Sequence, residues 1–120
     1  MKIVNLDGYT TNPGDQSWEW LGKYGDYTVY DRTAADEVLP RAKGANLLII
    51  NKTVLDRAAL EALRPELEYI GLQSTGYNVV DCAAAKELGI TVCNIPAYST
   101  NAVAQLVFAF ILSFTNQVST

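Results

Sequence analysis

Residues 67–81, LEYIGLQSTGYNVVD, are the part of this 120-residue sequence most suggestive of a binding site. An apolar run ends in the turn Ser74-Thr75-Gly76, and a helix is expected a few residues later. Backbone N–H groups in such a turn, with a hydroxyl on either side, can hold an oxygen of a carboxylate or phosphate. A plain strand-to-helix turn with a glycine at positive φ is the alternative, and these three residues alone favour it.

Other side chains near the same edge of the predicted sheet could add to a ligand site. Lys52 could donate a charged hydrogen bond to an anion, although a loop lysine is more often solvated. Tyr9 and Tyr98 could form the walls of a pocket or pack against neighbours. Asp7 and Asp81 are better explained as a turn residue and a helix cap, so no pair of carboxylates is placed for acid–base chemistry.

The composition argues against several kinds of site and partner. The sequence has no histidine and only 2 cysteines, which excludes the usual zinc sites, and we expect no bound metal. A net charge of -4 makes nucleic acid and anionic membranes poor partners. The longest apolar stretch, around 102–112, is shorter than the ~20 residues that span a membrane. We expect a cytoplasmic protein with reduced thiols.

Apolar runs with strand character alternate with helix signals along the whole chain. The expected strands are residues 2–6, 27–30, 46–50, 67–73 and 90–95. The third of these is apolar throughout, which indicates a strand buried on both faces. The alternation predicts an α/β fold with a five-stranded parallel sheet in the order 2-1-3-4-5 and helices on both faces.

Capping residues predict where the helices begin. Each expected start has a capping side chain or a first-turn proline: Asn12-Pro13, Thr33, Thr53-Val54-Leu55-Asp56, Asp81 and Ser99-Thr100. The first four helices are expected to end at helix-breaking residues: Gly22 and Gly25, Gly44, Pro65 and Gly89. Pro40 falls inside the second helix, where it could end or kink it.

Ligands of doubly wound α/β folds bind outside the carboxyl ends of the strands. Two such families fit poorly here. A phosphate-accepting receiver domain would need an aspartate where the third strand ends, and this chain has Asn51; it would also need a lysine in place of Ile95. A flavodoxin would need a backbone N–H in the loop after the first strand where Pro13 has none.

From Leu67 onward the sequence resembles the N-terminal part of the D-isomer-specific 2-hydroxyacid dehydrogenases, nearest to the glycerate dehydrogenase (hydroxypyruvate reductase) branch. Three phrases carry the resemblance: Ser74-Thr75-Gly76-Tyr77-Asn78 with Asp81, Gly89-Ile90 with Val92, and Pro96-Ala97-Tyr98-Ser99-Thr100 with Val103-Ala104-Gln105. The first half agrees in layout, including Asn51-Lys52-Thr53 before a capped helix.

The resemblance implies a flavodoxin-like substrate-binding domain followed by a Rossmann domain that binds NAD and carries catalytic Arg, Glu and His. It implies that the backbone of Thr75-Gly76 faces the carboxylate of a small 2-hydroxy or 2-oxo acid. The implied substrate-binding residues are Lys52, Ser74, Thr75, Gly76 and Tyr98. The implied contacts to the nicotinamide end of the cofactor are Asn101 and Val103.

The chain lacks the parts of that family that do the chemistry. It has no GxGxxG fingerprint and no histidine to act as the proton donor. We therefore expect residues 1–120 to be a single domain truncated before the Rossmann domain, with no catalytic residue, no cofactor of its own and no activity by itself. A free-standing flavodoxin-like binding or interaction module is the alternative, and the fold alone does not separate the two.

The last predicted helix, residues 100–118, is apolar on more than one face. One stripe at helical spacing contains Val103, Leu106, Val107, Phe110, Ile111 and Phe114. Other apolar residues lie off this stripe: Phe108, Ala109 and Leu112. Since an exposed apolar surface favours association or helix swapping, we predict a homodimer formed through this helix.

Overall fold

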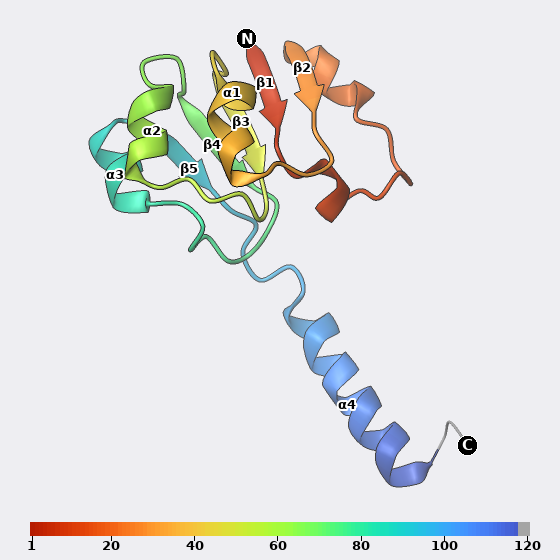
Figure 1. Ribbon diagram of the computed structural model, residues 1–120. Coiled ribbons are helices and arrows are strands. Elements are labelled where there is room, and N and C mark those ends of the chain that lie inside the picture. The colour runs from red at the N-terminus through yellow and green to blue at the C-terminus, as the bar shows by residue number, and fades with distance from the viewer. Residues whose placement is uncertain (118–120) are drawn as a thin grey trace.

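A computed structural model describes residues 1–117 and shows an α/β domain from which one long helix projects (Figure 1). The strands are β1 (Lys2–Asn5), β2 (Asp26–Val29), β3 (Leu47–Ile50), β4 (Tyr69–Leu72) and β5 (Thr91–Cys93). All neighbouring strands are parallel, and the sheet order is β2-β1-β3-β4-β5. The predicted α/β fold and strand order are confirmed.

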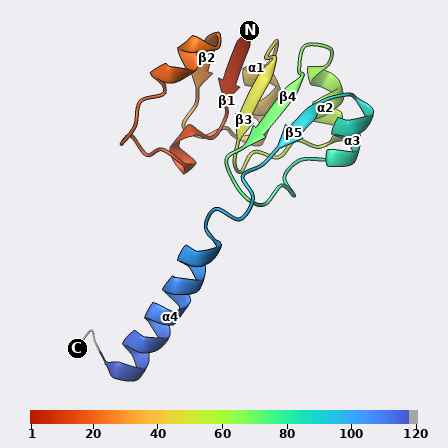
Figure 2. The same cartoon turned by 180° about the vertical axis from the view of Figure 1, so that it is seen from behind.

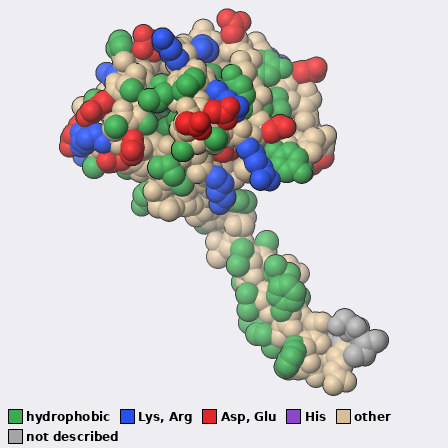
Figure 3. All heavy atoms as spheres, viewed as in Figure 1, with side chains coloured by type: hydrophobic (Ala, Val, Ile, Leu, Met, Phe, Trp, Pro, Cys, Tyr) green, Lys and Arg blue, Asp and Glu red, His purple; other side chains and the backbone are tan. Residues whose placement is uncertain are grey.

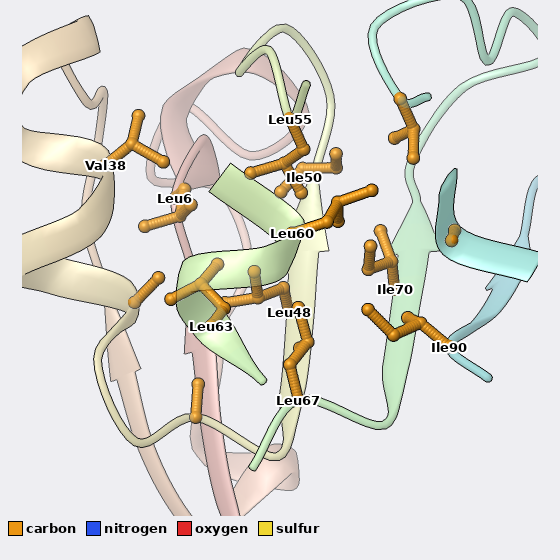
Figure 4. Packing of buried hydrophobic residues seen from close by; sticks show 14 of the residues in the cluster. Leu6, Val38, Leu48, Ile50, Leu55, Leu60, Leu63, Leu67, Ile70 and Ile90 are labelled. Atoms are coloured by element: carbon orange, nitrogen blue, oxygen red, sulfur yellow. The ribbon is translucent and has the colours of Figure 1, made fainter. Parts of the chain in front are cut away.

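Three helices cover one face of the sheet and enclose the core: α1 (Val38–Ala42), α2 (Arg57–Leu63) and α3 (Cys82–Glu87). Figure 4 shows Leu48 and Ile50 of β3 packed beneath Leu60 of α2. Burial alternates along β3, because Leu48 and Ile50 are buried while Leu47 and Ile49 are only half-buried. The prediction that this strand is buried on both faces is therefore wrong.

The opposite face of the sheet is covered only near β1 and β2. There the 3-10 helix η2 (Glu19–Lys23) buries Leu21 and brings Gly22 close to the ring of Tyr27, the register partner of the buried Ile3. Figure 2, seen from behind, shows β3, β4 and β5 with no helix in front of them. Helices do lie on both faces, as predicted, but the second layer is incomplete in the described part of the chain.

No helix begins at Asn12-Pro13, so that prediction is wrong. The Asn12 side chain instead organises a loop: its Oδ1 accepts hydrogen bonds from the N–H groups of Gly14 and Gln16 at 3.2 and 3.1 Å. An Asn side chain that bonds nearby backbone groups competes with helix formation. The segment has only two short 3-10 turns, η1 (Gly8–Thr10) and η2.

Neither Thr33 nor Thr53 caps a helix, contrary to prediction. The Thr33 hydroxyl donates to the carbonyl of Leu6 at 2.8 Å, and a 3-10 turn, η3 (Ala35–Glu37), precedes α1. The cap of α2 is Asp56, whose carboxylate accepts from the N–H of Ala59 at 2.9 Å. A carboxylate next to the first turn is the stronger cap because it also suits the helix dipole.

Several helix boundaries do follow the sequence signals. Asp81 caps α3 by accepting from the N–H of Ala84 at 2.9 Å. Gly44 and Gly89 adopt positive φ of 71° and 70° just beyond α1 and α3, as expected of C-terminal glycines. Pro40 lies in the first turn of α1, where its missing N–H is tolerated.

Helix α4 (Thr100–Asn116) extends away from the domain, and none of its residues is buried. Figure 3 shows hydrophobic side chains along its length, and Phe114 is 88% exposed. The projection raises the radius of gyration to 17.6 Å, above the ~14 Å of a compact chain of this length. The predicted helix end at Val118 lies outside the described residues. Among residues 1–117, no helix is long and apolar enough to cross a membrane.

Candidate functional site

The carboxyl ends of the strands gather at the edge of the sheet from which α4 departs (Figure 1). Backbone bonds tie these ends together: the N–H of Gln73 donates to the carbonyl of Ile50 at 2.8 Å, and that of Ile95 donates to Ser74 at 3.0 Å. The turn Ser74-Thr75-Gly76 thus lies between the end of β3 and the end of β5.

Hydroxyl groups of the turn fix its shape and are not free donors. Ser74 Oγ donates to the carbonyl of Gly76 at 2.7 Å, and Thr75 Oγ1 donates to the carbonyl of Ile95 at 3.0 Å. The Asn94 side chain closes the other side by donating to the carbonyl of Thr75 at 2.8 Å. The sequence suggested that these hydroxyls flank a ligand, but their protons are committed to the turn itself.

The backbone N–H groups of Thr75 and Gly76 have no hydrogen-bond acceptor among residues 1–117. Both residues are exposed, so the two donors are open to a ligand. Gly76 does not adopt positive φ. The alternative interpretation, in which the turn needs a glycine for a positive φ, is therefore wrong. What remains is a short turn whose open donors suit an oxygen of an anion.

Lys52 lies at the end of the neighbouring strand, in a loop held by a buried carboxylate. Asp7 is only 4% exposed, and its Oδ2 accepts hydrogen bonds from the N–H groups of Asn51, Lys52 and Thr53 at 2.7, 2.9 and 2.9 Å. This arrangement fixes the backbone from which the exposed Lys52 side chain extends. The sequence predicted Asp7 to be a turn residue. Its position at the end of a strand was the only indication in the sequence that it has a further structural role.

The other predicted site residues lie farther along the chain, towards α4. Tyr98 is 66% exposed in the connection after β5, next to Ala97, which has a positive φ of 56°. Asn101 and Val103 lie in the first turn of α4 and are exposed. These three side chains are presented to solvent.

Two ionisable groups away from this edge have shifted pKa values. A hydrogen bond and ion pair with Glu87, at 2.9 Å, raise the pKa of Arg57 on the outer surface of α2. A hydrogen bond with Cys93, together with burial, raises the pKa of Tyr69 on β4. Within residues 1–117, no group of three or more His, Cys, Asp or Glu side chains is placed to hold a metal ion.

Comparison with known proteins connects this geometry to a family. Residues 9–119 match the family described as D-isomer specific 2-hydroxyacid dehydrogenase, catalytic domain. The chain belongs to this family. Among curated relatives, it is 45% identical to a hydroxypyruvate reductase of Blautia hydrogenotrophica, over 98% of this chain and 37% of that protein. It is 36% identical to a glycerate dehydrogenase of Methylorubrum extorquens, over 87% of this chain and 32% of that protein.

Solved structures of other proteins show the same fold. An acyclic imino acid reductase in complex with NADPH and D-Arg superimposes with a TM-score of 0.78 at 28% identity, over 94% of this chain and 36% of that one. The apo D-lactate dehydrogenase of Escherichia coli does so with a TM-score of 0.72 at 29% identity, over 94% and 36%. The chain therefore spans only about a third of the length of these relatives, between 32% and 37%.

Proposed function

We propose that this chain is the substrate-binding part of an NAD-dependent D-2-hydroxyacid dehydrogenase of the glycerate dehydrogenase type. Its single flavodoxin-like domain would bind the carboxylate of a small 2-hydroxy or 2-oxo acid. The observation that carries the proposal is the pair of open N–H donors of Thr75 and Gly76 at the end of β4. The likeness to a hydroxypyruvate reductase over nearly the whole chain supports the choice of acid.

Each predicted residue has a distinct role in this proposal. Thr75 and Gly76 donate to the carboxylate, Lys52 adds a positive charge, and Ser74 holds the turn by its internal bond. Tyr98 forms a wall of the cleft. Asn101 and Val103, exposed where α4 begins, would lie against the nicotinamide ring.

NAD would supply hydride transfer when bound, and most of its contacts must come from outside this chain. The sequence has no GxGxxG turn to hold the pyrophosphate and no histidine to move the substrate proton. What these residues provide is orientation of the acid and one side of the nicotinamide site. We therefore propose that residues 1–120 alone do not turn over substrate.

Two measurements on the chain test this proposal. In an amide NMR titration, D-glycerate should shift the signals of Thr75 and Gly76, and Lys52→Gln should weaken the binding about tenfold through loss of a charged hydrogen bond. Lys86→Gln, which removes a lysine of α3, is the matched control. Shifts confined to other parts of the sheet would refute the carboxylate site. Oxidation of NADH with hydroxypyruvate should be at background, and clear turnover would refute inactivity.

We also propose that the chain is a cytoplasmic homodimer. The support for a dimer is α4, whose apolar side chains are all exposed, including Phe108 and Phe110 at 65% and 66%. The support for the compartment is that Cys82 and Cys93 are free and exposed thiols, which suit a reducing environment.

A further inference from the structure

A pocket at the carboxyl edge of the sheet shares only one residue, Lys52, with the proposed substrate site. It is formed by the loops after β1, β2 and β3 and has a volume of about 390 Å³. The residues that line it are polar or charged: Asp7, Thr10, Arg32, Thr33, Lys52 and Thr53. Figure 3 shows Lys and Arg side chains along this edge, close to the start of α4.

Both cations of the pocket are available to a ligand. Among residues 1–117, neither Arg32 nor Lys52 forms an ion pair, and their side chains make no hydrogen bond to the protein. The Arg32 guanidinium carbon lies 5.2 Å from the centre of the Tyr9 ring. This contact orients the guanidinium through the ring face and leaves its N–H donors open.

Asp7 is the only carboxylate in the lining, and backbone hydrogen bonds stabilise its charge. Its Oδ2 accepts from the three backbone N–H groups of residues 51–53, so it acts as part of the wall. The two cations outnumber it, which leaves the pocket with a net positive charge. An anion is therefore the ligand that the electrostatics favour.

Thr53 gives an independent indication that a ligand belongs here. The residue is only 5% exposed, and its Oγ1 is buried without a hydrogen-bond partner in the described part of the chain. A buried hydroxyl left unpaired costs about 1–3 kcal/mol, so such groups are normally satisfied. A ligand oxygen in the pocket, which Thr53 lines, would supply the missing partner.

We propose that this pocket binds an oxyanion group, a phosphate or a second carboxylate. Arg32 would donate through its planar fork and Lys52 as a point charge, with Thr10 and Thr53 contributing hydroxyls. The group is either a free anion or the far end of the acid substrate, and the second source rests on the proposed function. The support for the second source is Lys52, which belongs to both the pocket and the proposed site and follows β3, one strand spacing of about 4.8 Å from β4.

The experiment is an amide NMR titration of the chain with three probes: inorganic phosphate, D-glycerate and 3-phospho-D-glycerate. Phosphate should shift the amides of Thr10, Arg32 and Thr53, and Arg32→Gln should weaken its binding about tenfold. Lys86→Gln should leave it unchanged. Circular dichroism will show whether the variants are folded, as expected for changes at exposed side chains.

The probes separate the two sources. If the anion is the far end of a substrate, 3-phospho-D-glycerate will shift both the pocket and the Ser74–Gly76 turn and bind about tenfold tighter than D-glycerate, an advantage lost in Arg32→Gln. If it is a free anion, phosphate and 3-phospho-D-glycerate will bind the pocket alike, without the turn. No shift at the pocket, or shifts that Arg32→Gln does not alter, would overturn the proposal. D-glycerate binding at the turn in Arg32→Gln tests the proposed function separately.

Discussion

At the scale of single residues, Asp7 is the polar group on which the site edge depends. Its buried carboxylate joins the end of β1 to the loop after β3 through three hydrogen bonds from backbone N–H groups. Hydrogen bonds to a charged group contribute more than neutral ones, and buried donors left without an acceptor are costly. This residue therefore serves stability and loop geometry together.

Replacing Asp7 with alanine should lower the free energy of unfolding by about 3 kcal/mol, because the N–H groups of residues 51–53 lose their acceptor. Urea denaturation measures the change. Asp31→Ala is the control, since that exposed side chain has no hydrogen bond or ion pair among residues 1–117 and should change stability by less than about 0.5 kcal/mol. Equal effects of the two substitutions would show that the three hydrogen bonds are not stabilising.

The open donors of the turn make a prediction for hydrogen exchange. The amides of Thr75 and Gly76 should exchange at close to the unprotected rate, because they are exposed and have no acceptor in the described chain. The amide of Ile95 donates to the carbonyl of Ser74 at 3.0 Å, so it should exchange more slowly by a factor of about ten or more. Strong protection at Thr75 would mean that the turn is closed in solution.

Local sequence signals predicted residue roles only where the partner is also local. Asp81 was identified as a cap because its partner, Ala84, is three residues away. Asp7 was not, because its partners lie more than forty residues along the chain and meet it only once β1 and β3 pair. The same limit hid the bond from Thr75 Oγ1 to the carbonyl of Ile95, which requires the end of β5 to lie beside the turn.

At the scale of elements, the strand order followed from the sequence because alternating strands and helices with right-handed crossovers leave few arrangements. The absence of a helix at Asn12 could not be predicted, since Asn is an equally good helix cap and loop organiser. Its side chain here accepts from the N–H groups of Gly14 and Gln16. The half-buried state of Leu47 and Ile49 was also hidden, because it depends on which helices reach that face.

The caps of α2 and α3 can be tested by matched substitutions. Asp56→Ala and Asp81→Ala should each cost about 1 kcal/mol of stability, because each removes the acceptor of a first-turn N–H group. Thermal unfolding monitored by circular dichroism measures both. Asp15→Ala, in the loop before η2, should be close to neutral, and a comparable loss there would argue against capping as the cause.

Two glycines with positive φ distinguish backbone strain from steric overlap. A Cβ at Gly25, with φ of 154°, would lie 2.1 Å from the carbonyl oxygen of Met1, whereas one at Gly14, with φ of 113°, would meet nothing within 4 Å. Gly25→Ala should therefore destabilise by about 2 kcal/mol more than Gly14→Ala, as seen by urea denaturation. Similar losses of stability at the two positions would show that the backbone near Met1 and Gly25 moves apart at little cost in free energy.

At the scale of the whole molecule, α4 should determine the oligomeric state. The helix contributes no residue to the core, so a chain ending after Ser99 should fold as the full chain does. We expect sedimentation at micromolar protein to show a dimer for the full chain and a monomer for the shortened one. A monomeric full chain would refute the dimer. A shortened chain that stays dimeric would place the interface elsewhere, for example on the half-buried sheet face.

The sequence of α4 also determines which solution conditions should separate the two subunits of the proposed dimer. Between Thr100 and Asn116 there is no Asp, Glu, Lys or Arg. Raising the ionic strength weakens interfaces held by charged side chains, and this helix has none, so added salt should not weaken an interface formed by α4 through screening. Added sulfate should tighten the association, because excluded salts strengthen the burial of apolar surface. A mild nonionic detergent, which offers the helix an alternative apolar surface, is the additive that should separate the subunits.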